Sequence, residues 1–327
     1  MARWCLLNLY GAVWSRYETL PVNSYRSALL FALLSAVGFA VQDSVVKILA
    51  HTGSIWQLML IRSFLVIMIL WLWTRLRGGS TVITPNGWRW PIIRAVFMSL
   101  AYTLFYSSYP YVSLSEAASC FFTAPMFVCL FAGIFLKESI GIYRIMAVCG
   151  GFCGALLIIQ PGATEFRPIL ILPVFAGAAY AMGVTVTRAF CSDQPSLALT
   201  AVHNLFYAFI GALVVSFMPL LPIDTEMVAK NPFIFREWVP LSGQLLILIG
   251  ATSFTHIVAM TASIRAYQSA ETVLIAPIEY SYLIFAAAID FFLWQVVPGA
   301  LHVLGAMLIF GSGSLIAVRE WKAGQRA

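Results

Sequence analysis

Long apolar runs follow one another along most of the chain, and they limit its possible folds more than any other feature. Hydrophobic residues make up 61% of the 327 residues and charged residues only 10%. Ordinary globular domains are about 45–50% apolar and about 25% charged, and much of any folded surface faces the solvent. A water-soluble fold of this length cannot hide so much apolar surface. We therefore expect an integral membrane protein surrounded by the lipid bilayer.

A helix needs about 20 apolar residues to cross the hydrocarbon of a bilayer. Closed β-barrels are the other spanning architecture, but these runs are too long and lack period-two alternation. The sequence therefore predicts an all-α protein with ten transmembrane helices. The ten stretches, bounded by charges, Gly and Pro, are residues 26–50, 55–74, 91–112, 115–136, 140–160, 168–190, 196–220, 240–266, 269–293 and 297–318.

The placement of lysine and arginine predicts the orientation, because cytoplasmic loops carry an excess of these residues. With a cytoplasmic N-terminus, fourteen of the 19 basic residues fall in inside segments, and only Arg167, Lys230 and Arg236 fall in outside loops. We expect a multi-pass protein of the cell inner (plasma) membrane with both termini in the cytoplasm. This topology explains the net charge of +6, so no nucleic-acid partner is expected.

The first 25 residues precede the first predicted helix. Their apolar stretch is interrupted by Asn8, Tyr10 and Gly11, and it lacks the uninterrupted core and cleavage site of a signal peptide. We expect residues 1–25 to form a cytoplasmic or interfacial segment and residues 319–327 a cytoplasmic tail.

The six cysteines include no C-x-x-C pair. Cys149 and Cys153 lie one helical turn apart, but no His or carboxylate is close in sequence to complete a metal site. We interpret the cysteines as small buried hydrophobic residues and expect no metal and no cofactor.

Two similar segments indicate an internal duplication. "YVSLSEAASCFFTAP" (111–125) and "YQSAETVLIAP" (267–277) both give Tyr-x-Ser, then Glu, then Ala-Pro. The predicted repeats are residues 26–161 and 166–318. Five helices per repeat is an odd number, so the repeats lie in opposite orientations, the inverted plan of many secondary transporters. In the fifth and tenth helices, we expect Gly150, Gly154, Gly311 and Gly313 to let helix backbones touch.

The chain resembles the drug/metabolite transporter superfamily, in its ten-span group of two EamA-type repeats. The resemblance is carried by "FAVQDSVVKILA" (39–50), "SEAASCFFTAPMFVCLFAGIFLKE" (115–138), "AETVLIAPIEYSYLIFAAAIDFFLW" (270–294) and the Gly-rich fifth and tenth helices. It implies a small-molecule carrier that is a monomer or a homodimer. The family usually ends its ninth helix with Gly-Glu, whereas this chain has Trp294-Gln295.

Glu279 is the first candidate for a functional residue. It lies ten residues into the ninth predicted helix, near the membrane midplane, where a charge costs at least about 2.5–3.5 kcal/mol. Pro277 and, in the first repeat, Pro125 are expected to break their helices and to free a backbone carbonyl. Glu279 with Tyr280 suits a cationic or hydrogen-bonding solute, or proton coupling. A purely structural ion pair is the open alternative.

Asp43 and Lys47 are one turn apart on the first helix, and Arg62 lies at a similar depth in the second. Either these three residues neutralise one another, or Lys47 or Arg62 binds a carboxylate or phosphate of the substrate. Asp290, near the outer end of the ninth helix, is expected to be interfacial.

Tyrosine and histidine side chains at interior depths form a further candidate set. Tyr102 and Tyr106, with Tyr109, recur on one face of the third helix. Their hydroxyl groups need partners in lipid, and a wet cavity would provide them. Tyr180 and His256 either bind solute or form helix–helix hydrogen bonds.

These features favour a secondary transporter that moves a small organic metabolite by alternating access, coupled to protons or to a gradient. The pattern around Glu279 most resembles proteins that take up S-adenosylmethionine, riboflavin or similar cofactors and amino-acid derivatives. An exporter of amino acids or cationic drugs is the alternative within the family. A membrane-embedded lipid-modifying enzyme is the alternative of another class, but the four histidines are scattered and have no acidic neighbour within four positions, so no enzyme is expected.

Overall fold

The computed structural model describes residues 22–76, 84–135, 142–160, 167–191, 194–269 and 278–324. Over these residues every regular element is a helix and no strand occurs, which confirms the all-α class. Residues 1–21 of the predicted N-terminal segment, and Pro277, lie outside the described residues.

The helices vary from one turn to more than thirty residues, and two short 3-10 helices adjoin α8 and α9. The bounds are α2 Val22–Thr52, α3 Ile55–Leu76, α4 Arg89–Ser107, α5 Leu114–Phe121, α6 Ala124–Phe135, α7 Ile142–Ile159, η1 Pro168–Leu170, α8 Ile171–Phe190, α9 Ser196–Phe217, η2 Met218–Leu220, α10 Thr225–Lys230, α11 Pro232–Phe235, α12 Gly243–Ser269, α14 Ser281–Trp294 and α15 Ala300–Gly324.

Among the described residues, six helical stretches are long and apolar enough to cross a membrane. They are Ser27–Thr52, Ile55–Leu76, Leu114–Phe135, Pro168–Thr187, Leu197–Leu220 and Gly243–Ser263. Shorter apolar helices cover Ile145–Ile159, Ser281–Trp294 and Ala300–Leu315. Each of the ten predicted stretches overlaps at least one helix. That all ten cross the bilayer stays a prediction.

Large apolar side chains cover the outside of the bundle. Phe64, Phe209, Ile247 and Ile284 are 60–73% exposed. Monomeric soluble proteins rarely expose apolar patches larger than a few hundred Å². Lipid tails solvate such a surface at no cost, so the outer faces are those of a multi-pass membrane protein.

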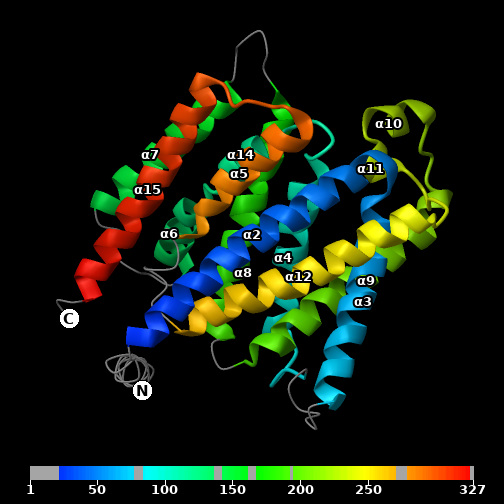
Figure 1. Cartoon of the computed structure of the whole chain (residues 1–327), viewed down its shortest axis with the longest axis horizontal. Helices are drawn as coiled ribbons and strands as arrows, with labels where there is room; N and C mark the ends of the chain where they lie inside the picture. The colour runs from blue at the N-terminus through cyan, green and yellow to red at the C-terminus, as the bar shows by residue number, and fades with distance from the viewer. Residues whose placement is uncertain are drawn as a thin grey trace.

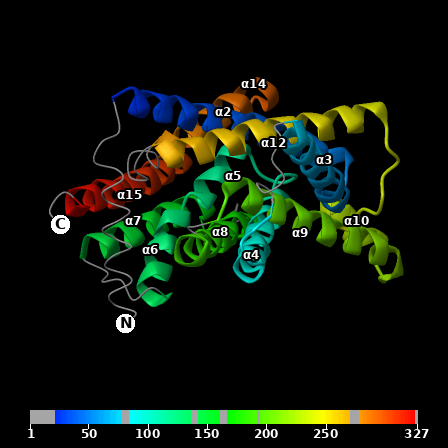
Figure 2. The same ribbon diagram turned by 90° about the horizontal axis from the view of Figure 1, so that it is seen from below.

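The helices pack in antiparallel pairs that are distant in sequence. The most extensive contacts join α2 to α12, α7 to α15, α4 to α8 and α3 to α9 (Figure 1). Seen from below, α2, α12 and α14 form one layer, and α4, α6 and α8 lie in the other (Figure 2). The interior polar residues are therefore held between helices from both halves of the chain.

The ends of the helices gather on two faces of the bundle, seen at opposite sides of Figure 1. We call the side that carries α10 and α11 the distal face, and the side that carries Val22 and Gly324 the terminal face. The distal face also holds the connections at 52–54, 108–113 and 295–299.

Glycine permits the closest of the helix contacts, between α7 and α15. A Cβ atom added to Gly154 would lie 2.6 Å from the carbonyl oxygen of Gly305, and one added to Gly305 would lie 2.6 Å from that of Gly154. Gly150 faces Ser312 in the same contact. The expectation for Gly311 is wrong, because a Cβ atom there would meet nothing within 4 Å.

Hydrogen bonds at the start of α5 and in the break before α6 show how these two short helices begin. Ser113 and Glu116 form a capping box that starts α5, with Ser113 N donating to Glu116 Oε2 at 2.9 Å. Pro125 lies in the first turn of α6, where its missing N–H costs nothing. Thr123, in the break, donates its hydroxyl to the carbonyl of Cys120 at 2.7 Å. Pro125 thus lies directly after the break between α5 and α6.

Candidate functional site

Polar side chains from five helices meet inside the bundle, and all of them are buried. We call this set the central cluster. Its members are Gln42 and Asp43 from α2, Arg62 from α3, Tyr106 from α4, His256 from α12 and Tyr282 from α14.

Gln42 connects three of these helices. Its Nε2 donates to the hydroxyl of Tyr106 at 2.7 Å, and its Oε1 lies 3.1 Å from Nδ1 of His256. The amide orientation is set by Asp43, whose acceptor Oδ1 lies 3.4 Å from Nε2. An amide oxygen only accepts, so Nδ1 of His256 carries the proton and its Nε2 is an acceptor.

Asp43 and Lys47 are neighbours on α2 but have different partners. Asp43 Oδ2 accepts a hydrogen bond from the hydroxyl of Tyr282 at 2.6 Å. Lys47 Nζ pairs with Asp290 Oδ1 at 3.4 Å. Within the described part of the chain, no ion pair joins Asp43 to Lys47 or to Arg62. Asp43, Lys47 and Arg62 therefore do not neutralise one another as a group of three. Asp43 and Arg62 belong to the central cluster, and Lys47 belongs to the site of Asp290.

Arg62 is fully buried between two aromatic rings. Its Cζ lies 5.7 Å from the ring centroid of Tyr106 and 5.3 Å from that of Tyr207. Nη1 lies 3.4 Å from the hydroxyl of Tyr106. Nε and Nη2 have no hydrogen-bond partner among the residues that the structure describes. Buried polar groups are normally hydrogen-bonded, so this edge of the guanidinium calls for a further acceptor.

Other unpaired polar atoms lie around Arg62. The ring of His203 lies 5.4 Å from that of Tyr207 and 5.5 Å from that of Tyr102, measured between centroids. Both nitrogens of His203 and Nε2 of His256 lack a partner among the described residues. More than nine-tenths of buried polar groups in proteins are hydrogen-bonded. A concentration of exceptions between α3, α4, α9 and α12 indicates a place for water or a polar solute.

The predicted tyrosine face of α4 points into the bundle. The rings of Tyr102 and Tyr106 are 5.7 Å apart and those of Tyr106 and Tyr109 are 5.3 Å apart. Tyr102 is half-buried, and the other two are buried. Tyr106 thus belongs to the central cluster, and Tyr102 lies among the aromatic rings around Arg62.

Glu279 is a helical residue, and the turn at Tyr280 separates it from the start of α14 at Ser281. Glu279 is half-buried, and Tyr180 on α8 lies within its electrostatic range. The ring of Tyr280 is buried and packs 4.9 Å from that of Phe122, while Tyr180 packs 5.3 Å from Phe121. Glu279 is therefore placed near the break between α5 and α6, and its role stays a prediction.

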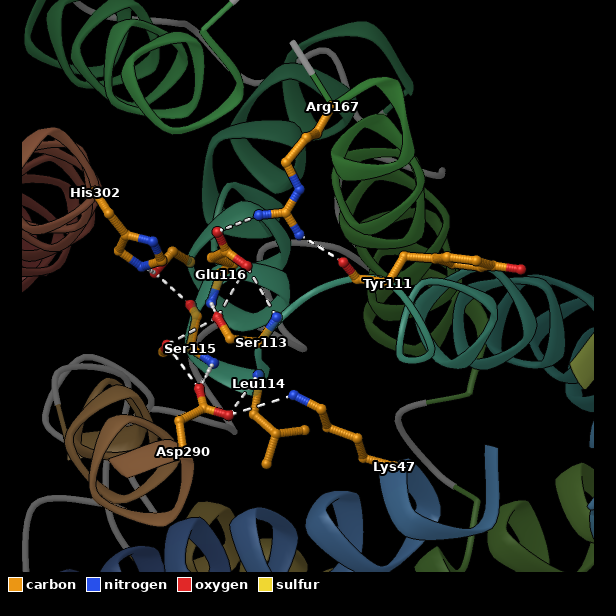
Figure 3. A network of polar contacts seen from close by, with 10 residues as sticks. Lys47, Tyr111, Ser113, Leu114, Ser115, Glu116, Arg167, Asp290 and His302 are labelled. Atoms are coloured by element: carbon orange, nitrogen blue, oxygen red, sulfur yellow. Dashed lines mark hydrogen bonds and ion pairs between the residues drawn. The ribbon is translucent and has the colours of Figure 1, made fainter. Parts of the chain in front are cut away.

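Asp290 is fully buried, so the expectation of an interfacial residue is wrong. Its Oδ1 accepts from the backbone N–H of Leu114 at 3.0 Å and pairs with Lys47 (Figure 3). Its Oδ2 accepts from Ser115, at 2.8 Å from the backbone nitrogen and 2.7 Å from the hydroxyl. The carboxylate thus holds the N-terminus of α5, where a negative charge is favourable. Its sequence depth alone does not reveal this, because the partner helix is far away in sequence.

A second ion pair lies beside Asp290 on the distal face. Arg167 Nη1 contacts Glu116 Oε1 at 2.8 Å, and its Nη2 donates to the carbonyl of Tyr111 at 2.6 Å (Figure 3). Nε2 of His302 lies 3.2 Å from the hydroxyl of Ser119. Since Glu116 also accepts from Ser113 N in the capping box, two acids, Glu116 and Asp290, hold the start of α5.

Two cavities adjoin these networks. A cleft of about 330 Å³ on the distal face is lined by Ser113, Glu116, Ile158, Gln160 and residues 296–302. A cavity of about 10 Å³, the size of one water, is lined by His256 and by residues of α3, α9 and α12. The small cavity thus touches the central cluster. Within the described residues, no group of three His, Cys, Asp or Glu side chains is arranged to hold a metal ion.

Sequence reasoning missed Gln42, Tyr207 and the structural role of Asp290. A glutamine next to an aspartate inside an apolar helix is a usable signal, since both need partners in lipid. Tyr207 has no comparable signal, because its importance comes from its position beside Arg62.

Comparisons with known proteins agree with this picture. A model of the EamA-like transporter family matches residues 26–160. The chain is 25% identical to the pseudopaline exporter CntI of Pseudomonas aeruginosa (strain UCBPP-PA14), with 87% of this chain and 93% of that protein covered. It is 23% identical to a riboflavin transporter of Vibrio cholerae (91% and 95% covered). It is also 22% identical to an S-adenosylmethionine uptake transporter of Rickettsia felis (93% and 97% covered).

The fold also has a match among solved structures. One crystal structure superposes with a TM-score of 0.58 at 14% identity, and the match covers 92% of this chain and 98% of that chain. At this identity the likeness concerns the fold alone.

Proposed function

Residues 26–160 form an EamA-like transporter family domain, and from this premise we propose that the chain is a secondary transporter of a small organic metabolite. The observation that carries the proposal is the group of buried, unpaired polar atoms around Arg62 inside the bundle. A protein that only needed a stable membrane fold would gain nothing from leaving them without partners, because each costs about 1–3 kcal/mol. A transported solute would supply the missing partners.

The relatives suggest cofactors and amino-acid derivatives as substrates. Two carry names that specify riboflavin and S-adenosylmethionine, and a third is named as a pseudopaline exporter. We propose a metabolite of this kind as the substrate, with uptake as the first candidate. Export is the second candidate, favoured by the similarity to the pseudopaline exporter. An enzymatic function has no such support.

The pattern of helix contacts supports an inverted repeat. In an inverted repeat, each helix of the first half corresponds to one of the second. The corresponding pairs here are α2 and α8, α3 and α9, α4 and α12, α6 and α14, and α7 and α15, and we exchange the members of each pair. The contact of α2 with α12 then becomes that of α4 with α8, and α6 with α8 becomes α14 with α2. The contact of α4 with α9 likewise becomes that of α12 with α3. Two repeats related in this way can tilt alternately toward either side of the membrane.

The distal face is tied closed in this conformation. Gln57 and Val239 exchange two hydrogen bonds, at 2.8 and 3.2 Å, and Trp56 Nε1 donates to the carbonyl of Ile234 at 2.7 Å. The two ion pairs of Figure 3 close the same face elsewhere. We take this face as extracytoplasmic, because the excess of lysine and arginine lies on the terminal face. Opening it would require these contacts to separate in each transport cycle.

Glu279 is the proposed coupling residue. It is a half-buried carboxyl group that acts electrostatically on Tyr180, and an acid inside a membrane bundle is a candidate for proton coupling, whereas the Asp290 carboxylate is held by an ion pair and three hydrogen-bond donors. Proton release and uptake by Glu279 would then drive the change between the two tilts.

The test is transport by the purified protein in liposomes. Labelled S-adenosylmethionine and riboflavin are offered with and without a pH gradient. We expect the wild type to accumulate one of them in response to the gradient, and Glu279→Gln to lose this response by at least about tenfold while still exchanging labelled for unlabelled compound.

Glu226→Gln is the matched control, because Glu226 is an exposed acid on α10 that pairs with Lys230. It should transport like the wild type. Transport by Glu279→Gln that responds to the gradient as the wild type does would exclude Glu279 from coupling.

A further inference from the structure

The geometry of Arg62 points to a carboxylate on the transported compound, and we propose that Arg62 binds that carboxylate through its Nε–Nη2 edge. This inference rests on the proposed transport function and adds the chemical class of the substrate. Two observations support it: the contacts of the guanidinium, and the fact that Lys47 and Arg94 inside the bundle already have partners.

The free atoms of Arg62 form one edge of the guanidinium. Nη1 is engaged by the hydroxyl of Tyr106, and Nε and Nη2 are the atoms without partners among the described residues. In arginine, one N–H bond of Nε and one of Nη2 lie in the plane of the guanidinium and point in the same direction from one of its edges. Their spacing matches the two oxygens of a carboxylate, which accept both bonds at once. A single hydroxyl or carbonyl oxygen would satisfy only one of them.

The other cations inside the bundle already have partners. Lys47 pairs with Asp290 and lies 4.4 Å above the ring of Trp294. Arg94 Nε donates to Thr187 Oγ1 at 2.9 Å. Among the lysine and arginine side chains that the structure describes, Arg62 is the one whose buried nitrogens lack a partner. The choice between Lys47 and Arg62 as the anion-binding residue therefore falls on Arg62.

Asp43 explains how a buried arginine is tolerated when the site is empty. Its carboxylate acts electrostatically on Arg62 but makes no ion pair with it within 4.0 Å among the described contacts. Asp43 instead binds Tyr282 and Gln42. The buried charge is thus partly balanced while the Nε–Nη2 edge stays available.

The surroundings of the edge suit an organic acid. The rings of Tyr102, Tyr207 and His203 pack against one another beside Arg62 and offer flat apolar surfaces. Nε2 of His256 is available to a polar group of the same compound. The cavity of about 10 Å³ reaches His256 and Val66, one helical turn from Arg62, and marks where the site is least tightly packed.

The test uses pairs of compounds that differ only at the carboxylate. S-adenosylmethionine is compared with its decarboxylated analogue, and each standard amino acid with its carboxamide. Riboflavin and riboflavin 5′-phosphate form a further pair, in which the anion is a phosphate. Binding is measured on the full-length protein in lipid nanodiscs by the shift in melting temperature, and transport by counterflow in liposomes.

We expect at least one carboxylate to bind wild-type protein at least about tenfold more tightly than the partner compound that lacks the carboxylate. Arg62→Gln should abolish this difference, and Arg62→Lys should retain only part of it, because lysine has no bidentate edge. Arg94→Gln, which removes another buried arginine, should lower the melting temperature of the protein but keep the preference for the carboxylate. The partial preference of Arg62→Lys is a second, independent readout, which keeps the test valid if Arg62→Gln does not fold.

Three results would overturn the inference. Equal binding of carboxylates and of the partner compounds that lack the carboxylate, with transport intact, would remove the carboxylate from recognition and leave the proposed function standing. Arg62-dependent binding of riboflavin 5′-phosphate, with no carboxylate bound, would replace the carboxylate by a phosphate. Absence of binding and of transport for every compound would remove the proposed function and this inference with it.

Discussion

Asp290 is the residue whose surroundings depart most from its position in the sequence. Near the end of an apolar run it reads as a residue in contact with water. The structure instead surrounds it with two backbone N–H groups, a hydroxyl and an ammonium group, with no solvent exposure. A buried carboxylate is stable only with such a complete set of donors. Asp290 is therefore a structural anchor between α14, α5 and α2.

Replacement of Asp290 tests this role. Asp290→Asn should lower the free energy of unfolding by about 3 kcal/mol, because Lys47 is left as an uncompensated buried charge. The measurement is thermal unfolding in detergent.

The double variant Lys47→Met/Asp290→Asn should recover much of this loss, since no charge is then buried, and the Asn oxygen still accepts from one of the two backbone N–H groups of α5. Equal stability of Asp290→Asn and wild type would contradict the anchor. A double variant that is no better than the single one would assign the loss to the cap of α5 and not to the ion pair.

At the scale of elements, small residues decide how closely the helices approach. In α7 and α15 the backbones touch at Gly154 and Gly305, and in α2 a Cβ atom on Gly38 would lie 2.9 Å from the Cβ of Ala259 in α12. Helices in lipid gain little from burying apolar side chains against each other, so van der Waals contact between close backbones provides much of their association. The pairs α7–α15 and α2–α12 depend on these positions.

Gly154→Ala is therefore expected to destabilise the protein by about 1–3 kcal/mol, as overpacking does in well-packed interiors. The matched control is Gly311→Ala in α15, where the added Cβ meets nothing within 4 Å. Gly311→Ala should leave stability unchanged or raise it by about 0.5–1 kcal/mol, because alanine favours the helix. Melting temperatures of both variants in the same detergent give the comparison. Equal loss of stability in the two would show that the contact of α7 with α15 does not depend on glycine.

At the scale of the whole molecule, orientation in the membrane determines what the distal face contacts. The excess of lysine and arginine on the terminal face predicts that this face is cytoplasmic. The distal face, with α10, α11 and the ion pairs of Figure 3, would then face the other compartment.

Single cysteines in a cysteine-free variant test this orientation. Met227 is exposed on α10 at the distal face, and Trp88 is exposed before α4 at the terminal face. A membrane-impermeant thiol reagent should label Met227→Cys in intact cells, and Trp88→Cys only after the membrane is opened. The reverse pattern would invert the topology and place the closed face in the cytoplasm.

The sequence by itself determined the solvent, the helical class and the approximate place of each helix. Composition and the length of apolar runs decide these, because a chain in lipid must satisfy its backbone hydrogen bonds within each segment. It also pointed to Pro125 as a helix-breaking residue, since the effect of a proline on a helix depends on neighbours within four residues. Arg62, Asp43, Tyr106 and His256 were candidates because polar groups are rare in such helices.

Only the tertiary structure decided which of these groups are partners. Lys47 turns to Asp290 across 243 positions of sequence, and His256 to Gln42 across 214. Arg62 keeps a free edge because no helix brings an acceptor to it among the described residues. Periodicity records which face of a helix a side chain occupies, but not which other helix packs there. Pairing of charges between distant helices is set by that packing, so it was beyond the reach of any local pattern.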